Sequence, residues 1–171
     1  MPLQSQDSAL GAFLKALRQE KIDCILVGAM AAIEQGAPLM TVDYDFWVRL
    51  PERQYVRLLT IVQRQGGMIR ARTFYELSDG TQINAIFQPD GLRSFDAEWK
   101  NSRWGELEKV PVKVLPLQRV IASKQAANRE KDLAVLPILR RTLRLARKLK
   151  KRRGRTSKPT KRPKRNRPKG K

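Results

Sequence analysis

Two aspartates separated by one residue form the sequence feature with the clearest chemistry. Asp43 and Asp45 lie in the segment Thr41-Val42-Asp43-Tyr44-Asp45-Phe46. In an extended strand, side chains two positions apart lie on the same face, with Cα atoms roughly 6–7 Å apart. Two such carboxylates repel each other unless a cation lies between them. Mg²⁺ binds oxygen ligands, usually one or two carboxylates together with substrate phosphates, so the pair predicts a Mg²⁺ (or Mn²⁺) site.

A glycine upstream of the pair suits the binding of phosphate. Gly28 ends an apolar run at residues 22–27, which predicts a strand, and precedes a helix expected at residues 29–35 and closed by Gly36. Glycine lets the backbone approach a ligand closely, and the free N–H groups at a helix N-terminus favour phosphate. Gly28 and Ala29 are therefore candidate nucleotide-binding residues.

The remaining periodicity predicts helices and strands that follow one another over residues 1–147, which is typical of an α/β (α+β) domain. Helices are expected at residues 8–20 and 51–65, with one long helix from Pro116 onward. Further strands are expected at residues 43–50, 68–77, 81–88 and 110–115. Ser78-Asp79-Gly80 is a hairpin turn signal. Residues 89–109 are expected to be irregular, with Trp99 and Trp104 anchoring a loop.

The composition excludes several classes of catalytic site. The chain has no histidine, which rules out Ser-His-Asp and Cys-His nucleophiles and histidine-containing zinc sites. Its single cysteine, Cys24, lies in an apolar run and is expected to be a buried small hydrophobe. One cysteine forms no disulfide framework, no apolar run approaches the roughly 18 residues of a membrane span, and no signal peptide is evident. We expect a cytoplasmic protein that does not bind membranes.

The charge is divided unevenly along the chain. Residues 1–139 carry a net charge of +2, whereas residues 140–171 carry +18 and no acidic residue. Residues 148–171 are rich in Lys, Arg and Pro and are predicted to form a disordered tail. Residues 140–171 are expected to bind nucleic acid through its phosphates, without sequence specificity. The alternative is a solubilising or ribosome-associated extension.

Three segments together resemble the nucleotidyltransferase superfamily, which has the fold of DNA polymerase β, and in particular its AbiEii-type toxin branch. They are the Gly28 to Asp45 region, Val112-Lys113-Val114-Leu115-Pro116-Leu117, and Ser123-Lys124-Gln125-Ala126-Ala127-Asn128-Arg129-Glu130-Lys131-Asp132. The resemblance covers roughly residues 22–139. It implies a small mixed β-sheet flanked by helices. It also implies two metal ions that clamp the triphosphate of an NTP and align an acceptor hydroxyl for in-line attack.

By this resemblance, Asp43 and Asp45 ligate the metals and Lys124 and Lys131 neutralise phosphate charge. Gly28, Ala29 and Thr41 lie beside the nucleotide in the same way. The implied activity is transfer of a nucleoside monophosphate from an NTP to an RNA or protein acceptor.

Three departures from the family pattern favour binding over turnover. Asn84 stands where the family has a third catalytic carboxylate. Its amide oxygen can ligate a metal, but it brings no negative charge and is a poor base, so Asn84 is expected to be a weak substitute ligand. Ala29 replaces a second Gly or Ser, and Leu39-Met40 replaces a basic residue before Thr41. The alternative function is a catalytically weak or inactive module of this fold that binds nucleic acid or a toxin–antitoxin partner.

Simpler interpretations of the candidate residues stay open at this point. Lys124 and Lys131 would then extend to solvent along an apolar helix face. Arg129 and Asp132 would form either an ordinary exposed helix pair or a structural link across the site. Asp79 and Asp90 are expected to be turn residues. In the simplest interpretation, Asp43 and Asp45 belong to a basic chromosome- or ribosome-associated protein with no metal site.

Overall fold

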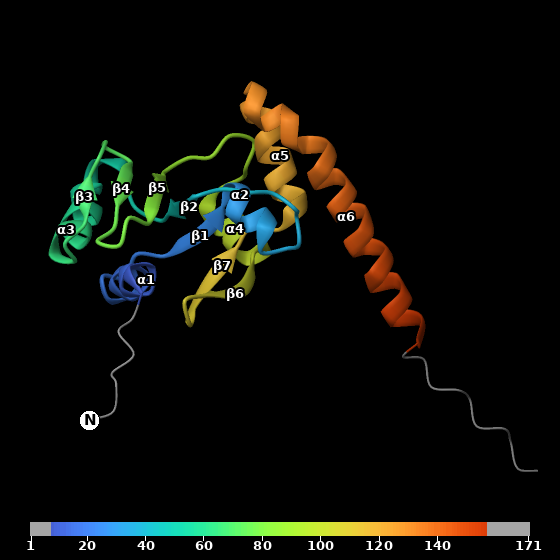
Figure 1. Ribbon diagram of the computed structural model, residues 1–171, viewed down its shortest axis with the longest axis horizontal. Coiled ribbons are helices and arrows are strands. Elements are labelled where there is room, and N and C mark those ends of the chain that lie inside the picture. The colour runs from blue at the N-terminus through green and yellow to red at the C-terminus, as the bar shows by residue number, and fades with distance from the viewer. Residues whose placement is uncertain (1–7, 157–171) are drawn as a thin grey trace, which may run out of the picture.

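A mixed sheet with helices on both faces organises residues 8–156, the part of the chain that the computed structural model describes (Figure 1). The sheet has seven strands in the order β3-β4-β5-β2-β1-β7-β6. The strands are β1 (Cys24–Val27), β2 (Asp43–Val48), β3 (Met68–Ile69), β4 (Phe74–Glu76), β5 (Gln82–Ile86), β6 (Arg103–Leu107) and β7 (Val110–Val114). The helices are α1 (Ala9–Gln19), α2 (Gly28–Ile33), α3 (Val56–Arg64), α4 (Phe95–Asn101), α5 (Leu117–Ala127) and α6 (Glu130–Thr156), with a 3-10 turn η1 (Glu52–Gln54).

The strand directions confirm the mixed sheet expected from the sequence. At its centre, β1 is antiparallel to β2 and parallel to β7, while β2 is parallel to β5. The neighbouring residues Phe46 and Trp47 of β2 point to opposite faces. Phe46 contacts Phe13 of α1, with ring centroids 6.4 Å apart, and Trp47 contacts Phe95 of α4 at 5.2 Å. Helices α1 and α4 therefore cover opposite faces of the sheet.

The prediction that residues 89–109 are irregular was wrong. Residues Phe95–Asn101 form α4, whose N-cap Ser94 accepts a hydrogen bond from the N–H of Ala97 (3.3 Å). Strand β6 follows and pairs with β7 through a turn at Glu108 and Lys109. Both turn residues have positive φ, 49° and 63°, without the glycine or asparagine that normally marks such a turn. The sequence therefore carried no turn signal for this hairpin.

The long helix expected from Pro116 is two helices. Asn128 ends α5 in the left-handed conformation (φ 51°), and its N–H donates to the carbonyl of Lys124. Asparagine is, after glycine, the residue that most readily closes a helix in this way. The second helix, α6, packs against α5 and continues beyond residue 147 to Thr156, so residues 148–156, expected within a disordered tail, are helical. The rest of the expected tail, residues 157–171, lies outside the described residues.

The side chain of Gln35 joins α2 to the start of α5. Its Nε2 donates to the carbonyls of Ala31 (2.7 Å) and Leu115 (2.9 Å), and its Oε1 accepts from the N–H of Leu117 (2.8 Å). Because Leu117 is the first residue of α5, Gln35 satisfies an N–H group that the helix itself leaves without a partner. The two helices that border the candidate site are thus held together. Among the helices of residues 8–156, none is long and apolar enough to span a bilayer.

Candidate functional site

The two aspartates and Asn84 lie together on one face of the sheet. Asp45 is opposite Val27, the last residue of β1, in the antiparallel pair, and beside Asn84 in the parallel pair with β5. Asp43 is two residues before Asp45 and so shares its face. The expected placement of both acids, next to the strand end that leads into Gly28, is what the structure shows.

The amide of Asn84 connects the two carboxylates. Its Nδ2 donates to Oδ2 of Asp43 (2.8 Å) and to Oδ1 of Asp45 (3.1 Å). The hydroxyl of Thr41 donates to the second oxygen of Asp43, Oδ1, at 2.5 Å. Both oxygens of Asp43 therefore have donors that fix its orientation, and Thr41, expected beside the nucleotide, acts on the site through Asp43.

Asp45 is the more perturbed of the two acids. Burial raises the pKa of its carboxyl above the ordinary value, and repulsion by Asp43 adds to this shift. The hydrogen bond from Asn84 and the positive charges of Lys124 and Lys131 act in the opposite direction but do not cancel it. A half-buried carboxylate beside a second carboxylate is stabilised by any cation that binds between them.

Glycine is the only residue type that fits position 28. The φ of Gly28 is +67°, a region that side-chain-bearing residues rarely adopt, and a β-carbon placed on it would lie 2.1 Å from Oδ2 of Asp45. The backbone of Gly28 therefore lies directly against the carboxylate, and its approach to phosphate stays a prediction. Ala29 follows as the second residue of α2. This helix has six residues, so its dipole is a weaker source of phosphate binding than expected.

A buried acid, Asp132, positions Lys124. The Lys124 ammonium lies 2.8 Å from Oδ1 of Asp132, and Nε of Arg129 lies 2.5 Å from its Oδ2. Asp132 is only 1% exposed, so it is not part of an ordinary surface pair but a link between α5 and α6. Burial raises the pKa of Asp132, but the hydrogen bonds from Lys124 and Arg129 outweigh it and hold the pKa below the ordinary value.

Other expected residues are placed less directly at the site. Lys131 is exposed and forms no ion pair with any residue of the described range, although its charge acts on Asp45. Phosphate contact by Lys124 or Lys131 stays a prediction. Asp79 accepts a hydrogen bond from the N–H of Thr81 (3.0 Å), and Asp90 also lies in a turn, so both are turn residues as expected. Cys24 packs against the core, and burial raises the pKa of its thiol to about 12.

The fold, rather than the sequence, relates this chain to known proteins. No protein-family model and no curated protein matches the sequence. Among solved structures, the crystal structure of ANT(2'')-Ia in complex with adenylyl-2''-tobramycin superposes with a TM-score of 0.52 and 16% identity, covering 82% of this chain and 90% of that one. An antigenic nucleotidyltransferase-like protein from Paracoccidioides brasiliensis gives a TM-score of 0.50 and 16% identity, covering 85% and 79%. The chain has the nucleotidyltransferase fold.

On this nucleotidyltransferase fold, the donor set fits a magnesium ion held partly by a substrate. Asp43 and Asp45 supply carboxylate oxygens. Asn84 supplies an amide oxygen if its side-chain amide rotates so that Oδ1 takes the place of Nδ2. Within residues 8–156 there is no group of three or more Asp, Glu, His or Cys that would hold a metal without further ligands. Two carboxylates completed by phosphate oxygens and water are a usual arrangement for Mg²⁺.

Sequence reasoning missed how Asn84 and Asp132 work within this nucleotidyltransferase fold. Asn84 was expected as a weak substitute ligand, and the structure shows it also donating to both acids. The bond between Lys124 and Asp132 spans eight positions across a helix break. The signal that could have revealed it was Asn128, which can end a helix and turn the chain back on itself.

Proposed function

We propose that this chain binds an NTP with Mg²⁺ (or Mn²⁺) at Asp43 and Asp45 and transfers its nucleoside monophosphate to a hydroxyl of an RNA or protein acceptor. The observation that carries the proposal is the direct contact between the Asp45 carboxylate and the backbone of Gly28. It places the Asp45 carboxylate at the strand end that leads into α2, so a metal held by the two acids would lie close to the backbone of Gly28. A nucleotidyltransferase fold carrying this arrangement at β1 and β2 supports the proposal.

Each residue has a role that follows from its contacts. Asp43 and Asp45 would hold the metal, which when bound neutralises phosphate charge and polarises the bond that is broken. Thr41 and Asn84 orient Asp43 through hydrogen bonds to its two oxygens. Gly28 lets the backbone come close to the Asp45 carboxylate and so to the metal that it would hold.

Lys124 would supply positive charge to the bound phosphates, since its charge already acts on Asp45. Asp132 holds it at 2.8 Å and so limits the positions that its ammonium adopts. A lysine that is 16% exposed and already ordered loses less side-chain freedom on binding phosphate than a solvent-exposed one. Lys131 would act as a second, weaker cation because it is exposed and the solvent screens its charge.

Because position 84 is an asparagine, we propose that the chain retains nucleotide binding but transfers the nucleotide slowly. The amide of Asn84 lacks the charge of the family's third carboxylate and cannot accept the proton of an acceptor hydroxyl. The metal bound with the NTP needs only Asp43 and Asp45, whereas a second metal would lack one anionic ligand. We therefore expect NTP binding to be measurable and transfer to be slow.

Calorimetric titration with Mg²⁺-NTP tests the binding step. The full chain is titrated with each of the four NTPs in Mg²⁺ and in EDTA, and the double variant Asp43→Ala/Asp45→Ala serves as the control. We expect saturable heat that depends on Mg²⁺ and disappears in the double variant. Equal binding by the double variant, or no binding of any NTP, would overturn the proposal.

Transfer of radiolabel from α-labelled NTP tests the chemical step. The full chain is incubated with RNA and with protein acceptors, and Asp43→Ala should abolish any labelling. Mg²⁺-NTP binding without labelling of any acceptor would favour a second function, which the Asn84 departure supports. In that case the fold is a binding module for nucleic acid or for a toxin–antitoxin partner, with residues 140–171 contributing the charge.

A further inference from the structure

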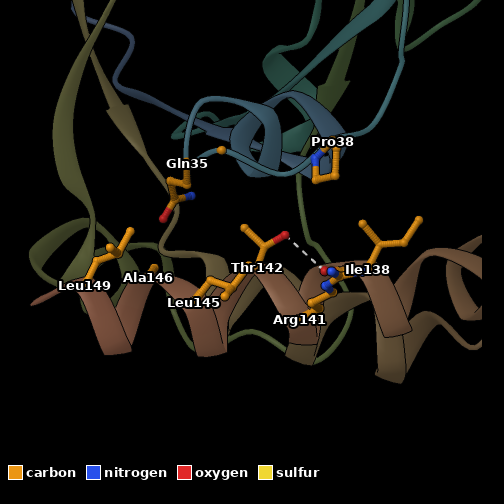
Figure 2. A pocket seen from close by; sticks show the side chains of 9 residues that line it. Gln35, Pro38, Ile138, Arg141, Thr142, Leu145, Ala146 and Leu149 are labelled. Atoms are coloured by element: carbon orange, nitrogen blue, oxygen red, sulfur yellow. Dashed lines mark hydrogen bonds between the residues drawn. The ribbon is translucent and has the colours of Figure 1, made fainter. Parts of the chain in front are cut away.

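A groove on the far side of α2 from the sheet is lined almost entirely by apolar atoms. It lies between α6 and the loop that follows α2, and its volume is about 610 Å³ (Figure 2). The loop contributes Gln35, Gly36 and Pro38, and α6 contributes Ile138, Arg141, Thr142, Leu145, Ala146 and Leu149. Gln35 already bonds to α2 and α5, so this wall of the groove is fixed.

One stripe of α6 is aimed into this groove. Ile138, Leu145 and Leu149 are spaced seven and four residues apart, which places them on one face of the helix. Figure 2 shows their side chains pointing from α6 toward the loop with Pro38. They are nevertheless 39%, 51% and 60% exposed. An exposed apolar stripe that faces a concave wall is typical of a surface that binds a partner.

The charges beside the stripe indicate the chemistry of that partner. Arg141 lines the groove, and helical spacing places Lys148 and Arg152 along the same margin of α6. From residue 140 onward the chain has no acid to offset these charges. A second copy of the same helix would be repelled, and residues 157–171 contain no apolar residue other than proline to fill the groove. Nucleic acid would match the positive charge but would leave the apolar stripe of Ile138, Leu145 and Leu149 uncovered.

We propose that this groove binds an acidic amphipathic α-helix of a partner protein. The apolar face of that helix would lie on Ile138, Leu145 and Leu149, and its acidic margin would pair with the Arg and Lys side chains of α6. A helix that binds in an apolar groove is anchored by side chains three, four and seven residues apart, and the residues of the stripe are seven and four residues apart. The proposal does not depend on NTP binding or transfer.

The loop that forms the groove also leads to the candidate metal site. From Gly36 it runs through Met40 and Val42, which are 99% and 77% exposed, directly to Asp43. A partner bound in the groove would therefore lie next to the segment that holds the first aspartate. This continuity places the partner beside the site without blocking the contact between Gly28 and Asp45.

A fluorescent synthetic peptide tests the groove. The probe is an amphipathic helix with leucines three and four residues apart and glutamates on its other faces, titrated with the full chain and followed by polarisation. A scrambled peptide of identical composition, with its leucines spread around the helix, is the control for charge. We expect the scrambled peptide to bind about tenfold more weakly or worse. Equal binding of the two peptides would overturn the proposal, because charge alone would explain it.

Matched variants locate the binding surface. Leu145→Ser/Leu149→Ser removes two of the three side chains of the apolar stripe without changing charge, and both residues are exposed enough for the fold to tolerate it. Val56→Ser, on α3, removes an equally exposed apolar side chain elsewhere. The double variant should lose about tenfold in peptide affinity and Val56→Ser should lose none. An unchanged double variant would overturn the proposal.

Two further measurements on the same proteins test the other occupants. Sedimentation velocity of the free chain should show a monomer; a dimer that the double variant dissociates would assign the groove to a second copy and overturn the proposal. RNA affinity should be the same for the wild type and the double variant. A parallel loss of RNA affinity in the double variant would assign the groove to nucleic acid and would also overturn it.

Discussion

The carboxylate of Asp45 occupies the space that a side chain at Gly28 would need. A β-carbon at Gly28 would lie 2.1 Å from Oδ2 and 2.9 Å from Cγ of Asp45, and the φ of Gly28 is +67°. The strand end and the acid are therefore matched to each other: glycine is required both by the backbone conformation and by the close approach of Asp45.

Replacing this glycine should damage the site more than the fold. In Gly28→Ala, the positive φ costs about 1–2 kcal/mol of unfolding free energy, and the new methyl group displaces the Asp45 carboxylate. We expect Mg²⁺-NTP affinity, measured by calorimetry, to fall at least as far as in an Asp45→Ala variant.

Gly36→Ala is a matched control for the backbone strain. Gly36 also has a positive φ, +88°, but a β-carbon there meets nothing within 4 Å. The strained φ should cost each variant about 1–2 kcal/mol of unfolding free energy in urea, and Gly28→Ala should lose more because its methyl group meets Asp45. Only Gly28→Ala should lose nucleotide affinity, and equal affinity losses would show that strain rather than contact with Asp45 decides the effect.

The Asn84→Asp variant tests what the third position contributes. A carboxylate there removes the amide donor that bridges Asp43 and Asp45 and adds a third negative charge. Without metal the melting temperature should fall, and with Mg²⁺ it should rise above that of the wild type in Mg²⁺, because the ion has a third anionic ligand. Label transfer from α-labelled NTP should increase.

The Asn84→Ala variant separates the effect of an added negative charge from the effect of losing the amide hydrogen bonds. It removes the same hydrogen bonds without adding a carboxylate, so it should destabilise the metal-free protein and gain no Mg²⁺ response. If Asn84→Ala and Asn84→Asp respond equally to Mg²⁺, the third position does not take part in metal binding.

Local spacing was enough to predict the acids and the glycine. Asp43 and Asp45 share a face because strand side chains alternate, and Gly28 marks the strand end because glycine interrupts an apolar run. Most of the helices and strands followed from the same periodicities, whereas the mixed sheet that they form followed from the family resemblance. These features depend on residues within a few positions of one another, which is why the sequence alone was sufficient for them.

Features that depend on contacts distant in sequence were not predictable. Strand β6 forms because β7 pairs with it around a turn at Glu108 and Lys109 that lacks the usual turn residues. The Lys124–Asp132 bond depends on α6 folding back on α5 after Asn128. The groove beside α6 depends on how that helix lies against α5 and the loop after α2. Periodicity identifies an element but does not show what it packs against.

Asp132→Asn should weaken the link between α5 and α6. It removes the negative charge that pairs with Lys124, a side chain only 16% exposed. Removing one partner of a buried ion pair lowers the free energy of unfolding by about 3 kcal/mol or more. Urea unfolding at pH 7 measures the loss. Glu130→Gln, an exposed acid in the first turn of α6, is the control and should cost less than about 1 kcal/mol. A loss no larger than that of Glu130→Gln would contradict a structural role for Asp132.

The same variant should change the response to acid. Because the pKa of Asp132 is lower in the folded chain than its ordinary value of about 3.9, its ionised form stabilises the fold above that value. This contribution is lost as the pH falls through the lowered pKa. The difference in unfolding free energy between wild type and Asp132→Asn should therefore be largest at neutral pH and shrink below about pH 4. A difference that stays constant from pH 7 into this range would contradict the lowered pKa.

Two truncations test how the basic residues share nucleic-acid binding. Ending the chain after Thr156 removes eight Lys and Arg and keeps the whole of α6, whereas ending it after Arg147 removes fourteen and shortens the helix. Each phosphate contact adds about 0.7 to the slope of log affinity against log salt for a single strand. The first truncation should lower both the affinity for single-stranded RNA and the slope, and the second should remove most of what remains. Salt-sensitive binding that survives the second truncation unchanged would place the phosphate contacts on residues 8–147 instead.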